Sequence, residues 1–147
     1  MQFAPPMMFG AAQGPLSAIG VIGLGVMGSS ICLNFAENAK CRVSGFDIAE
    51  EKASAVEARA NEEGDLPVVT FTDMRAFVRS LDRPRRVVLL VPAGKAVDAA
   101  LSQVSALLSQ GDVVVDMGNE WFKITEERME RMEAKGILYM GCGISGG

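Results

Sequence analysis

The chain has 147 residues, 49% of them hydrophobic and 22% charged, which is enough for one well-packed domain and too little for two. Its net charge of −4 argues against the broad phosphate-binding surface that nucleic-acid partners require. No apolar run approaches the roughly 20 residues that span a bilayer, and the N-terminus lacks the basic start and continuous apolar stretch of a secretory signal. We therefore expect a cytoplasmic protein that binds neither nucleic acid nor membranes.

Residues 1–17 contain three prolines and two glycines and no charged residue. They show no helical or strand periodicity that could bury them. They are predicted to be a disordered extension, and the folded domain is predicted over residues 18–147.

A glycine-rich turn follows the first apolar run of the domain. The run Ala18–Gly23 reads as a strand, residues 23–28 (GLGVMG) fit the pattern G-x-G-x-x-G, and the segment from Val26 reads as a helix. In this motif the three glycines permit the tight turn, the approach of a pyrophosphate to the backbone, and close packing of helix on strand. The pyrophosphate then lies at the helix N-terminus, where N–H groups are unpaired and the helix dipole is positive. The turn therefore predicts a dinucleotide site.

An acidic residue lies where a ribose-binding carboxylate is expected. Asp47 ends the next apolar run, Arg42–Phe46, and follows the third glycine, Gly28, by 47 − 28 = 19 residues. The alternative is that Asp47 caps the helix that begins after Ala49, and the two roles are compatible.

The rest of the chain alternates short β-branched runs with amphipathic stretches, the pattern of right-handed βαβ units. The predicted strands are Ala18–Gly23, Arg42–Asp47, Val68–Phe71, Arg86–Val91, Asp112–Asp116 and Ile137–Met140. The predicted helices are Val26–Asn38, Glu50–Asn61, Asp73–Leu81, Ala96–Leu108 and Lys123–Lys135. The basic cluster at 83–86 is predicted to be a solvated turn entering a strand, without a function.

These elements predict an α/β fold, a Rossmann-type doubly wound, mostly parallel sheet with helices on both faces and strand order 3-2-1-4-5-6. Ligands of such sheets bind beyond the carboxyl ends of the strands. Three of these ends carry suitable residues: the glycine turn, Val91–Gly94 and Asp116–Asn119.

Three cysteines, Cys32, Cys41 and Cys142, form an odd and scattered set without C-x-x-C spacing. Cys32 falls on the apolar face of a predicted helix. We expect reduced thiols and no metal site.

Beyond the glycine motif, three segments occur in the order and spacing of one family: residues 84–91 (PRRVVLLV), 111–119 (GDVVVDMGN) and 145–147 (SGG). From about Ile19 to the last residue, the chain resembles the cofactor domain of 6-phosphogluconate dehydrogenase. Members of that family oxidise 6-phosphogluconate at C3 with a nicotinamide dinucleotide, and the product loses carbon dioxide to give ribulose 5-phosphate, a step of the pentose phosphate pathway. The resemblance implies NADP or NAD as cofactor and 6-phosphogluconate as substrate.

The resemblance also implies which residues bind. The predicted cofactor-binding residues are Gly23, Leu24, Gly25, Val26, Met27, Gly28, Asp47, Val91, Pro92, Ala93 and Asn119. The predicted substrate-binding residues are Asn119, Ser145, Gly146 and Gly147. A carboxamide and a hydroxyl can bond sugar hydroxyls, and glycine N–H groups can approach an anion without obstruction by a Cβ.

Two departures from the family pattern bear on the choice between NAD and NADP. The NADP-using members carry asparagine, arginine and threonine after the second strand, whereas this chain has residues 47–49 (DIA), with a carboxylate and no cation for a 2′-phosphate. Pro92 stands where the common pattern has a lysine and is similar to the NAD-using branch. Both departures favour NAD, and the preference stays open.

The family's general base, a lysine, and its general acid, a glutamate, belong to an all-helical substrate domain that would follow Gly147, so no catalytic residue is expected in this chain. The chain has no histidine, and Lys95 is interpreted as a solvated residue at the start of a helix. We therefore expect an incomplete enzyme that binds cofactor without turnover, the full-length enzyme being a homodimer.

Two other functions are compatible with the sequence. A β-hydroxyacid dehydrogenase of the 3-hydroxyisobutyrate type shares the glycine motif, the aspartate and the Ser-Gly-Gly turn, but is expected to carry serine and threonine near Gly118 and Asn119. A non-catalytic NAD(P)-binding sensor that signals through a partner surface is the third possibility.

Overall fold

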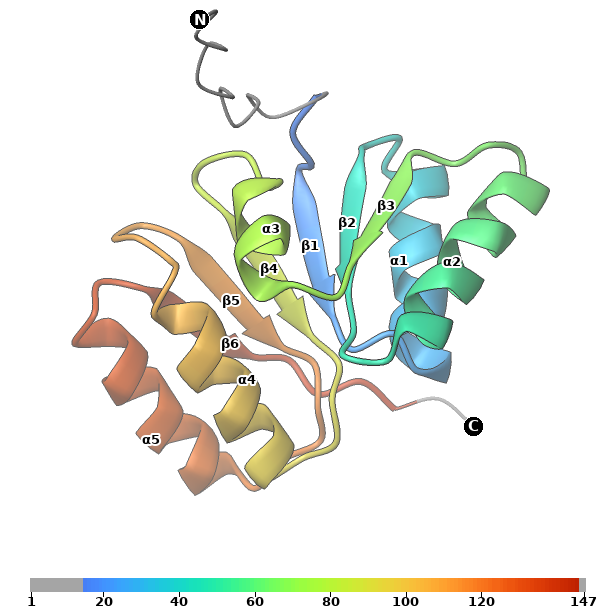
Figure 1. The fold of residues 1–147 in the computed structure, drawn as a ribbon. Coiled ribbons are helices and arrows are strands. Elements are labelled where there is room, and N and C mark those ends of the chain that lie inside the picture. The colour runs from blue at the N-terminus through green and yellow to red at the C-terminus, as the bar shows by residue number, and fades with distance from the viewer. Residues whose placement is uncertain (1–14, 146–147) are drawn as a thin grey trace, which may run out of the picture.

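Six strands and five helices alternate along residues 15–145, the part of the chain that the structure, a computed structural model, describes (Figure 1). In chain order they are β1 (Ile19–Ile22), α1 (Val26–Asn38), β2 (Val43–Phe46), α2 (Glu50–Glu62), β3 (Val68–Phe71), α3 (Met74–Arg79), β4 (Arg86–Leu89), α4 (Lys95–Ser105), β5 (Val113–Asp116), α5 (Phe122–Glu133) and β6 (Leu138–Gly141).

The strands form one sheet in the order β3-β2-β1-β4-β5-β6, and all five strand pairs are parallel. The chain winds away from β1 toward β3 and, after crossing over through α3, from β4 toward β6. The predicted α/β class, Rossmann-type winding and strand order are therefore confirmed. The direction of winding reverses between β1 and β4, and such a switch point is where ligands of open parallel sheets bind.

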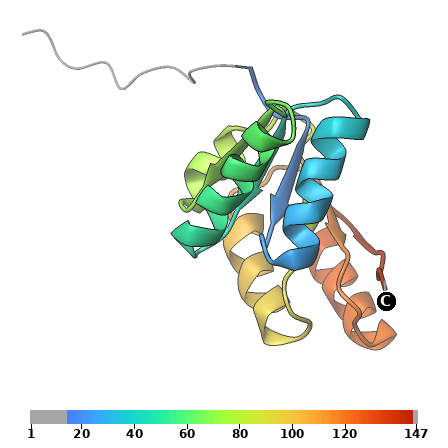
Figure 2. The same cartoon turned by 90° about the vertical axis from the view of Figure 1, so that its right-hand side faces the viewer.

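Each face of the sheet carries its own core, because neighbouring residues of a strand point to opposite faces. Val21 packs with Cys32 and the other buried residues of α1 and α2, whereas Ile22 packs with Leu101 and the buried residues of α3, α4 and α5. Figures 1 and 2 show α1 and α2 on one side of the sheet and the other three helices on the opposite side. Burial raises the pKa of the Cys32 thiol to about 12.

Several predicted element ends shift in the structure. The helix predicted over Ala96–Leu108 ends at Ser105, and Leu108 packs against the core from the turn that follows, so the apolar periodicity continues past the helix. The strand predicted over Arg86–Val91 ends at Leu89, although the N–H of Leu90 still donates to the carbonyl oxygen of Ile22 in β1 (2.8 Å).

The predicted boundary of the N-terminal extension also shifts. Residues 1–14 of the predicted disordered segment lie outside the described residues, but Ser17, its last residue, is 1% exposed and bridges to Leu81. The Ser17 hydroxyl also accepts a hydrogen bond from Ser44 of β2 (2.8 Å). The ordered part of the chain therefore begins before Ala18.

A buried ion pair lies at the amino-terminal end of the sheet. Arg85 and Asp112 precede β4 and β5, and Nη1 of Arg85 lies 3.0 Å from Oδ2 of Asp112. Burial alone would raise the pKa of Asp112, but hydrogen bonds from the backbone N–H groups of Ser109 and Arg85 and from the Arg85 guanidinium lower it below its ordinary value. The prediction of a solvated turn at 83–86 is therefore wrong for Arg85, which is 8% exposed because it has this partner.

Between residues 15 and 145, none of the helices has the length and apolar character needed to cross a membrane.

Candidate functional site

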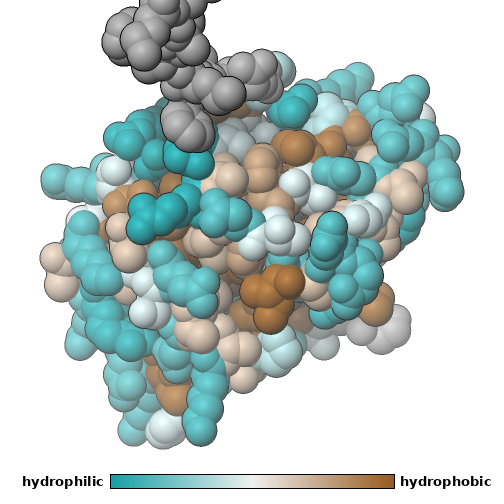
Figure 3. Space-filling model, viewed as in Figure 1, coloured by the Kyte–Doolittle hydropathy of each residue, from teal (hydrophilic) through white to brown (hydrophobic). Residues whose placement is uncertain are grey.

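A cavity of about 610 Å³ lies at the switch point, bordered by the carboxyl ends of β1, β2 and β4 and by α4. In the space-filling view, apolar surface is exposed between the hydrophilic outer sides of α2 and α4 (Figure 3). The predicted cofactor-binding residues that line the cavity are Gly23, Gly25, Val26, Met27, Gly28, Asp47, Val91 and Pro92. The volume is within the range of small-molecule and cofactor sites, roughly 300–1,000 Å³.

The glycine turn has the shape that the sequence motif requires. Gly23 has φ +95°, a conformation that side chains rarely adopt, and a Cβ on Gly28 would overlap the carbonyl oxygen of Gly23. Gly25 differs from both, because a Cβ there would meet no atom within 4 Å and would point into open space beside the cavity. No side chain caps α1, so the N–H groups of its first turn are available to an anion.

Asp47 connects this turn to the start of α2. Its Oδ2 accepts a hydrogen bond from the backbone N–H of Leu24 (2.8 Å) and its Oδ1 accepts one from Ala49 (2.9 Å). The residue is 7% exposed and lines the cavity. Asp47 thus fixes the two loops that border the cavity and places a negative charge at its wall.

Three of the predicted cofactor-binding residues are outside the cavity lining. Leu24 is 3% exposed and packs in the core on the α1 side. Ala93 is exposed on the loop after β4, beyond Val91 and Pro92. Asn119 borders a different cavity, described below.

The sequence interpretation missed part of the lining: Ile22, Phe46, Ile48, Lys52, Met74, Leu90, Ala96, Ala99, Ala100 and Gln103. Lys52 matters most, because it brings a cation to the end of the cavity where Asp47 and Ile48 lie. Its position in the first turn of the predicted helix, five residues after Asp47, could have indicated it. Ile48 is 85% exposed at the same border.

A second cavity, of about 360 Å³, lies at the carboxyl ends of β5 and β6. Its lining includes Asn119, Glu120 and Gly143. The Asn119 side chain donates a hydrogen bond from Nδ2 to the carbonyl oxygen of Ile144 (2.8 Å), which holds the segment before Ser145 beside this cavity. Of the predicted substrate-binding residues, Asn119 and the exposed Ser145 are thus close in the chain's fold, and Gly146 and Gly147 lie outside the described residues.

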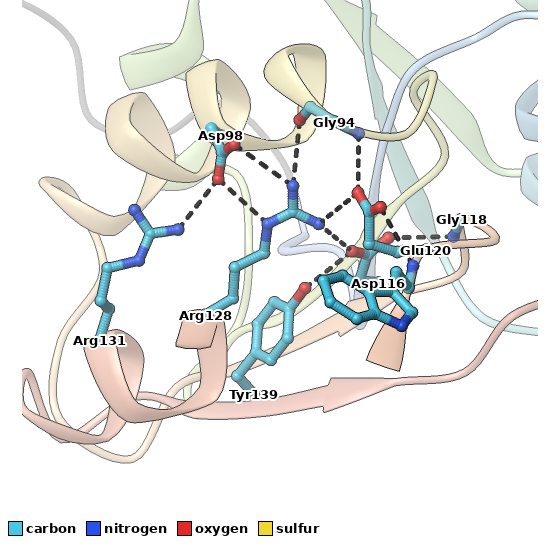
Figure 4. A network of polar contacts seen from close by, with 9 residues as sticks. Gly94, Asp98, Asp116, Gly118, Glu120, Arg128, Arg131 and Tyr139 are labelled. Atoms are coloured by element: carbon cyan, nitrogen blue, oxygen red, sulfur yellow. Dashed lines mark hydrogen bonds and ion pairs between the residues drawn. The ribbon is translucent and has the colours of Figure 1, made fainter. Parts of the chain in front are cut away.

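A fully buried arginine that the sequence interpretation also missed contacts both α4 and the end of β5 (Figure 4). Arg128 of α5 pairs with Asp98 of α4 (3.1 Å), with Glu120 (3.1 Å) and, at 3.5 Å, with Asp116, which also accepts a hydrogen bond from Tyr139. Within the described part of the chain, no group of three or more side chains is suited to hold a metal ion. The cluster is an ion-pair network centred on one guanidinium.

The network lowers the pKa of two of its carboxyl groups, those of Asp98 and Glu120. The N–H of Gly94, the N–H of Trp121 and the guanidinium of Arg128 hold the pKa of Glu120 below its ordinary value. The pKa of Asp98 is lowered mainly by its hydrogen bond with Arg128. Burial and the hydrogen bond to Asp116 raise the pKa of Tyr139, so its hydroxyl keeps its proton.

The doubly wound parallel sheet, the uncapped glycine turn and the cavity at the switch point define a Rossmann domain for a dinucleotide. The family model described as "NAD binding domain of 6-phosphogluconate dehydrogenase" matches residues 18–147. The chain therefore belongs to this family, and its cofactor is a nicotinamide dinucleotide.

Individual relatives agree with the family. The chain is 48% identical over 133 residues to a rice protein named "6-phosphogluconate dehydrogenase, decarboxylating 2, chloroplastic", a match that covers 90% of this chain and 26% of that protein. Among solved structures, a Plasmodium falciparum 6-phosphogluconate dehydrogenase, studied with NADP+ and with 6-phosphogluconate, matches with a TM-score of 0.82 at 34% identity, over 88% of this chain and 27% of that one. A Mycobacterium tuberculosis 3-hydroxyisobutyrate dehydrogenase, studied with L-serine, matches with a TM-score of 0.75 at 26% identity, over 90% of this chain and 42% of that one. The chain thus spans about a quarter of the length of the curated relative.

Proposed function

We propose that the chain is the dinucleotide-binding part of an enzyme that oxidises 6-phosphogluconate and releases carbon dioxide to give ribulose 5-phosphate. The observation that carries the proposal is the match of residues 18–147 to the family model, together with a cavity at the matching glycine turn. The nicotinamide ring, when bound, would accept the hydride. The cytoplasmic location, the pentose phosphate pathway and the homodimer of the full-length enzyme stay predictions, and the rice relative is a chloroplastic form.

The residues on the cavity suit the phosphates of such a cofactor. Gly25 leaves space beside the first turn of α1, and the N–H groups of that turn have no capping side chain. We assign the adenosine diphosphate part to this turn and the second half of the dinucleotide to Val91 and Pro92. Asn119 and Ser145 are assigned to the sugar acid, since they lie beyond the next strands.

The test is a calorimetric titration of the chain with NAD and with NADP, followed by an assay of dinucleotide reduction with 6-phosphogluconate. We expect saturable binding of a dinucleotide and no reduction by the chain alone, because it spans only about a quarter of the length of its curated relative. Absence of binding for both dinucleotides would refute the proposal.

We propose that NAD is preferred over NADP. Asp47 places a fixed carboxylate at the cavity wall, and Ile48 offers no hydrogen bond to a 2′-phosphate. Lys52 acts in the opposite direction as a cation on the same border. The comparison of Lys52→Met with Ile48→Arg separates these effects: the first should weaken NADP more than NAD, and the second should strengthen NADP alone. A wild-type chain that binds NADP more tightly than NAD would refute the preference.

A β-hydroxyacid dehydrogenase is the alternative, favoured by the similarity to the Mycobacterium tuberculosis enzyme. The two candidates differ in the acid that should bind near Asn119. Saturation-transfer NMR with the dinucleotide present, using 6-phosphogluconate and 3-hydroxyisobutyrate in competition, distinguishes them. Preference for 3-hydroxyisobutyrate would support the alternative, and a chain that binds dinucleotide and neither acid would favour the sensor.

A further inference from the structure

The peptide groups of Gly94 are held by two side chains from a distant part of the sequence. Its N–H donates to Oε2 of Glu120 (2.8 Å), and its carbonyl oxygen accepts from Nη2 of Arg128 (3.0 Å). Nη1 of Arg128 donates to the same Oε2 of Glu120 (3.1 Å). The three residues therefore form a closed ring of hydrogen bonds, which Figure 4 shows beside the first turn of α4.

Gly94 lies between two segments of the chain that line the cavity. Val91 and Pro92 line the cavity before it, and Ala96, Ala99 and Ala100 line the cavity from α4 after it. Gly94 has φ +86° and ψ −131° at the N-cap of α4. Only glycine adopts such a conformation readily, and glycine also leaves the backbone its greatest freedom. The carbonyl oxygen of Gly94 accepts backbone hydrogen bonds from Val97 and Asp98, and contacts from other elements constrain the turn further.

The Arg128 guanidinium supplies that constraint from a rigid base. Its side chain is fully buried, and it also donates to both carboxylate oxygens of Asp98 in the first turn of α4 (3.1 and 3.3 Å). One side chain of α5 thus holds two points at the start of α4. Burying a charged group is costly, and well-packed apolar residues often stabilise a core equally well. Stability alone is therefore a weak reason for an arginine here, and fixing one geometry of the cavity wall is a better one.

We propose that Arg128 and Glu120 are positioning residues for dinucleotide binding, which hold the Gly94 peptide so that Val91, Pro92 and the start of α4 form the cavity wall. This inference rests on the proposed function of the cavity. Neither side chain lines the cavity itself, so both act through Gly94.

Glu120→Ala and Glu120→Gln test the proposal in the 147-residue chain. Alanine removes the acceptor of the Gly94 N–H, whereas glutamine keeps an oxygen for it. The dissociation constants of NAD and NADP are measured by calorimetry, and thermal unfolding of each variant is measured in parallel. We expect Glu120→Ala to weaken binding of the preferred dinucleotide about tenfold or more and Glu120→Gln to recover most of that loss.

Two control variants separate positioning from stability. Asp112→Asn weakens the buried ion pair at the opposite end of the sheet, whose side-chain hydrogen-bond partners do not line the cavity. Arg131→Ala removes the exposed partner of Asp98 and leaves the Gly94 ring intact. Both controls should bind dinucleotide as the wild type does when the protein is folded.

The outcomes separate the two proposals. If the wild type binds neither dinucleotide, the proposed function fails. If the wild type binds and Glu120→Ala binds equally well, the positioning role is wrong. Two other results would also overturn the role. The first is that Asp112→Asn loses as much affinity as Glu120→Ala when both lose the same stability. The second is that Glu120→Gln recovers none of the lost affinity.

Discussion

Replacing Asp47 tests whether one carboxylate holds the two loops of the cavity together. In Asp47→Ala, the N–H of Leu24 and the N–H of Ala49 both lose their acceptor. Leu24 is buried, so its N–H would stay without water, whereas Ala49 is partly exposed and water can replace the lost acceptor there.

The magnitude follows from these two environments. A buried donor left without a partner costs about 1–3 kcal/mol, and a partly solvated bond contributes about 0.5–1 kcal/mol, so Asp47→Ala should lower the free energy of unfolding by about 2–4 kcal/mol. Asp47→Asn keeps one acceptor oxygen and should lose about 1–2 kcal/mol. It also removes the negative charge, so the ratio of NADP affinity to NAD affinity should rise.

The assay is urea unfolding followed by the fluorescence of Trp121, the only tryptophan of the sequence. Calorimetric titration with both dinucleotides follows at a temperature where all variants are folded. An Asp47→Ala variant as stable as the wild type would show that the two hydrogen bonds carry no net energy and would refute the reasoning. An unchanged NADP-to-NAD ratio in Asp47→Asn would refute the electrostatic part alone.

Three further predictions follow from single residues. Gly25→Ala should leave thermal stability nearly unchanged, because its Cβ meets no atom within 4 Å, and should weaken dinucleotide binding measured by calorimetry, because that Cβ points into the space expected for the pyrophosphate. In mass spectrometry after iodoacetamide treatment, the exposed Cys142 should be alkylated in the native protein, and Cys32, whose pKa burial raises to about 12, only after unfolding. Burial alone would raise the pKa of Asp112, but its hydrogen bonds, including that from Arg85, lower it overall. The stabilising effect of the Asp112 carboxylate should thus be complete above about pH 4 and disappear as the pH falls through the lower pKa of the folded state. Urea unfolding at several pH values should show that Asp112→Asn loses less free energy of unfolding on acidification than the wild type.

The fold could be predicted because its signals are local. The apolar runs, the glycine turn at 23–28 and the alternation of strands and helices each lie within a few neighbouring residues. The strand order follows from the handedness of crossovers and from the family of folds that the glycine turn indicates. The ends of helices could be predicted less accurately than their presence. The helix that ends at Ser105 is an example, since an apolar residue such as Leu108 can pack on the core from beyond the helix.

The polar contacts of the site could not be predicted in the same way. Arg128 bonds to Gly94 across 34 residues of sequence and to Asp98 across 30, and nothing in the local sequence of α5 indicates these partners. The spacing of Asp47 predicted a ribose-binding residue, which stays a prediction, but did not indicate its bond to Leu24, which depends on how the glycine turn approaches β2. Such contacts are set by tertiary packing, which the sequence pattern does not contain.

The charges around the cavity explain how an acidic chain can hold an anionic ligand. Of the cavity-lining residues in the described part of the chain, Asp47 is negative and Lys52 is positive, and both lie at the β2 border. Arg128 is a strong cation, but its charge is engaged by Asp98, Glu120 and Asp116. We therefore expect the pyrophosphate to bind the uncapped N–H groups of α1, at the positive end of the helix dipole. Backbone groups bind at short range and need no basic surface, which reconciles a net charge of −4 with a dinucleotide site.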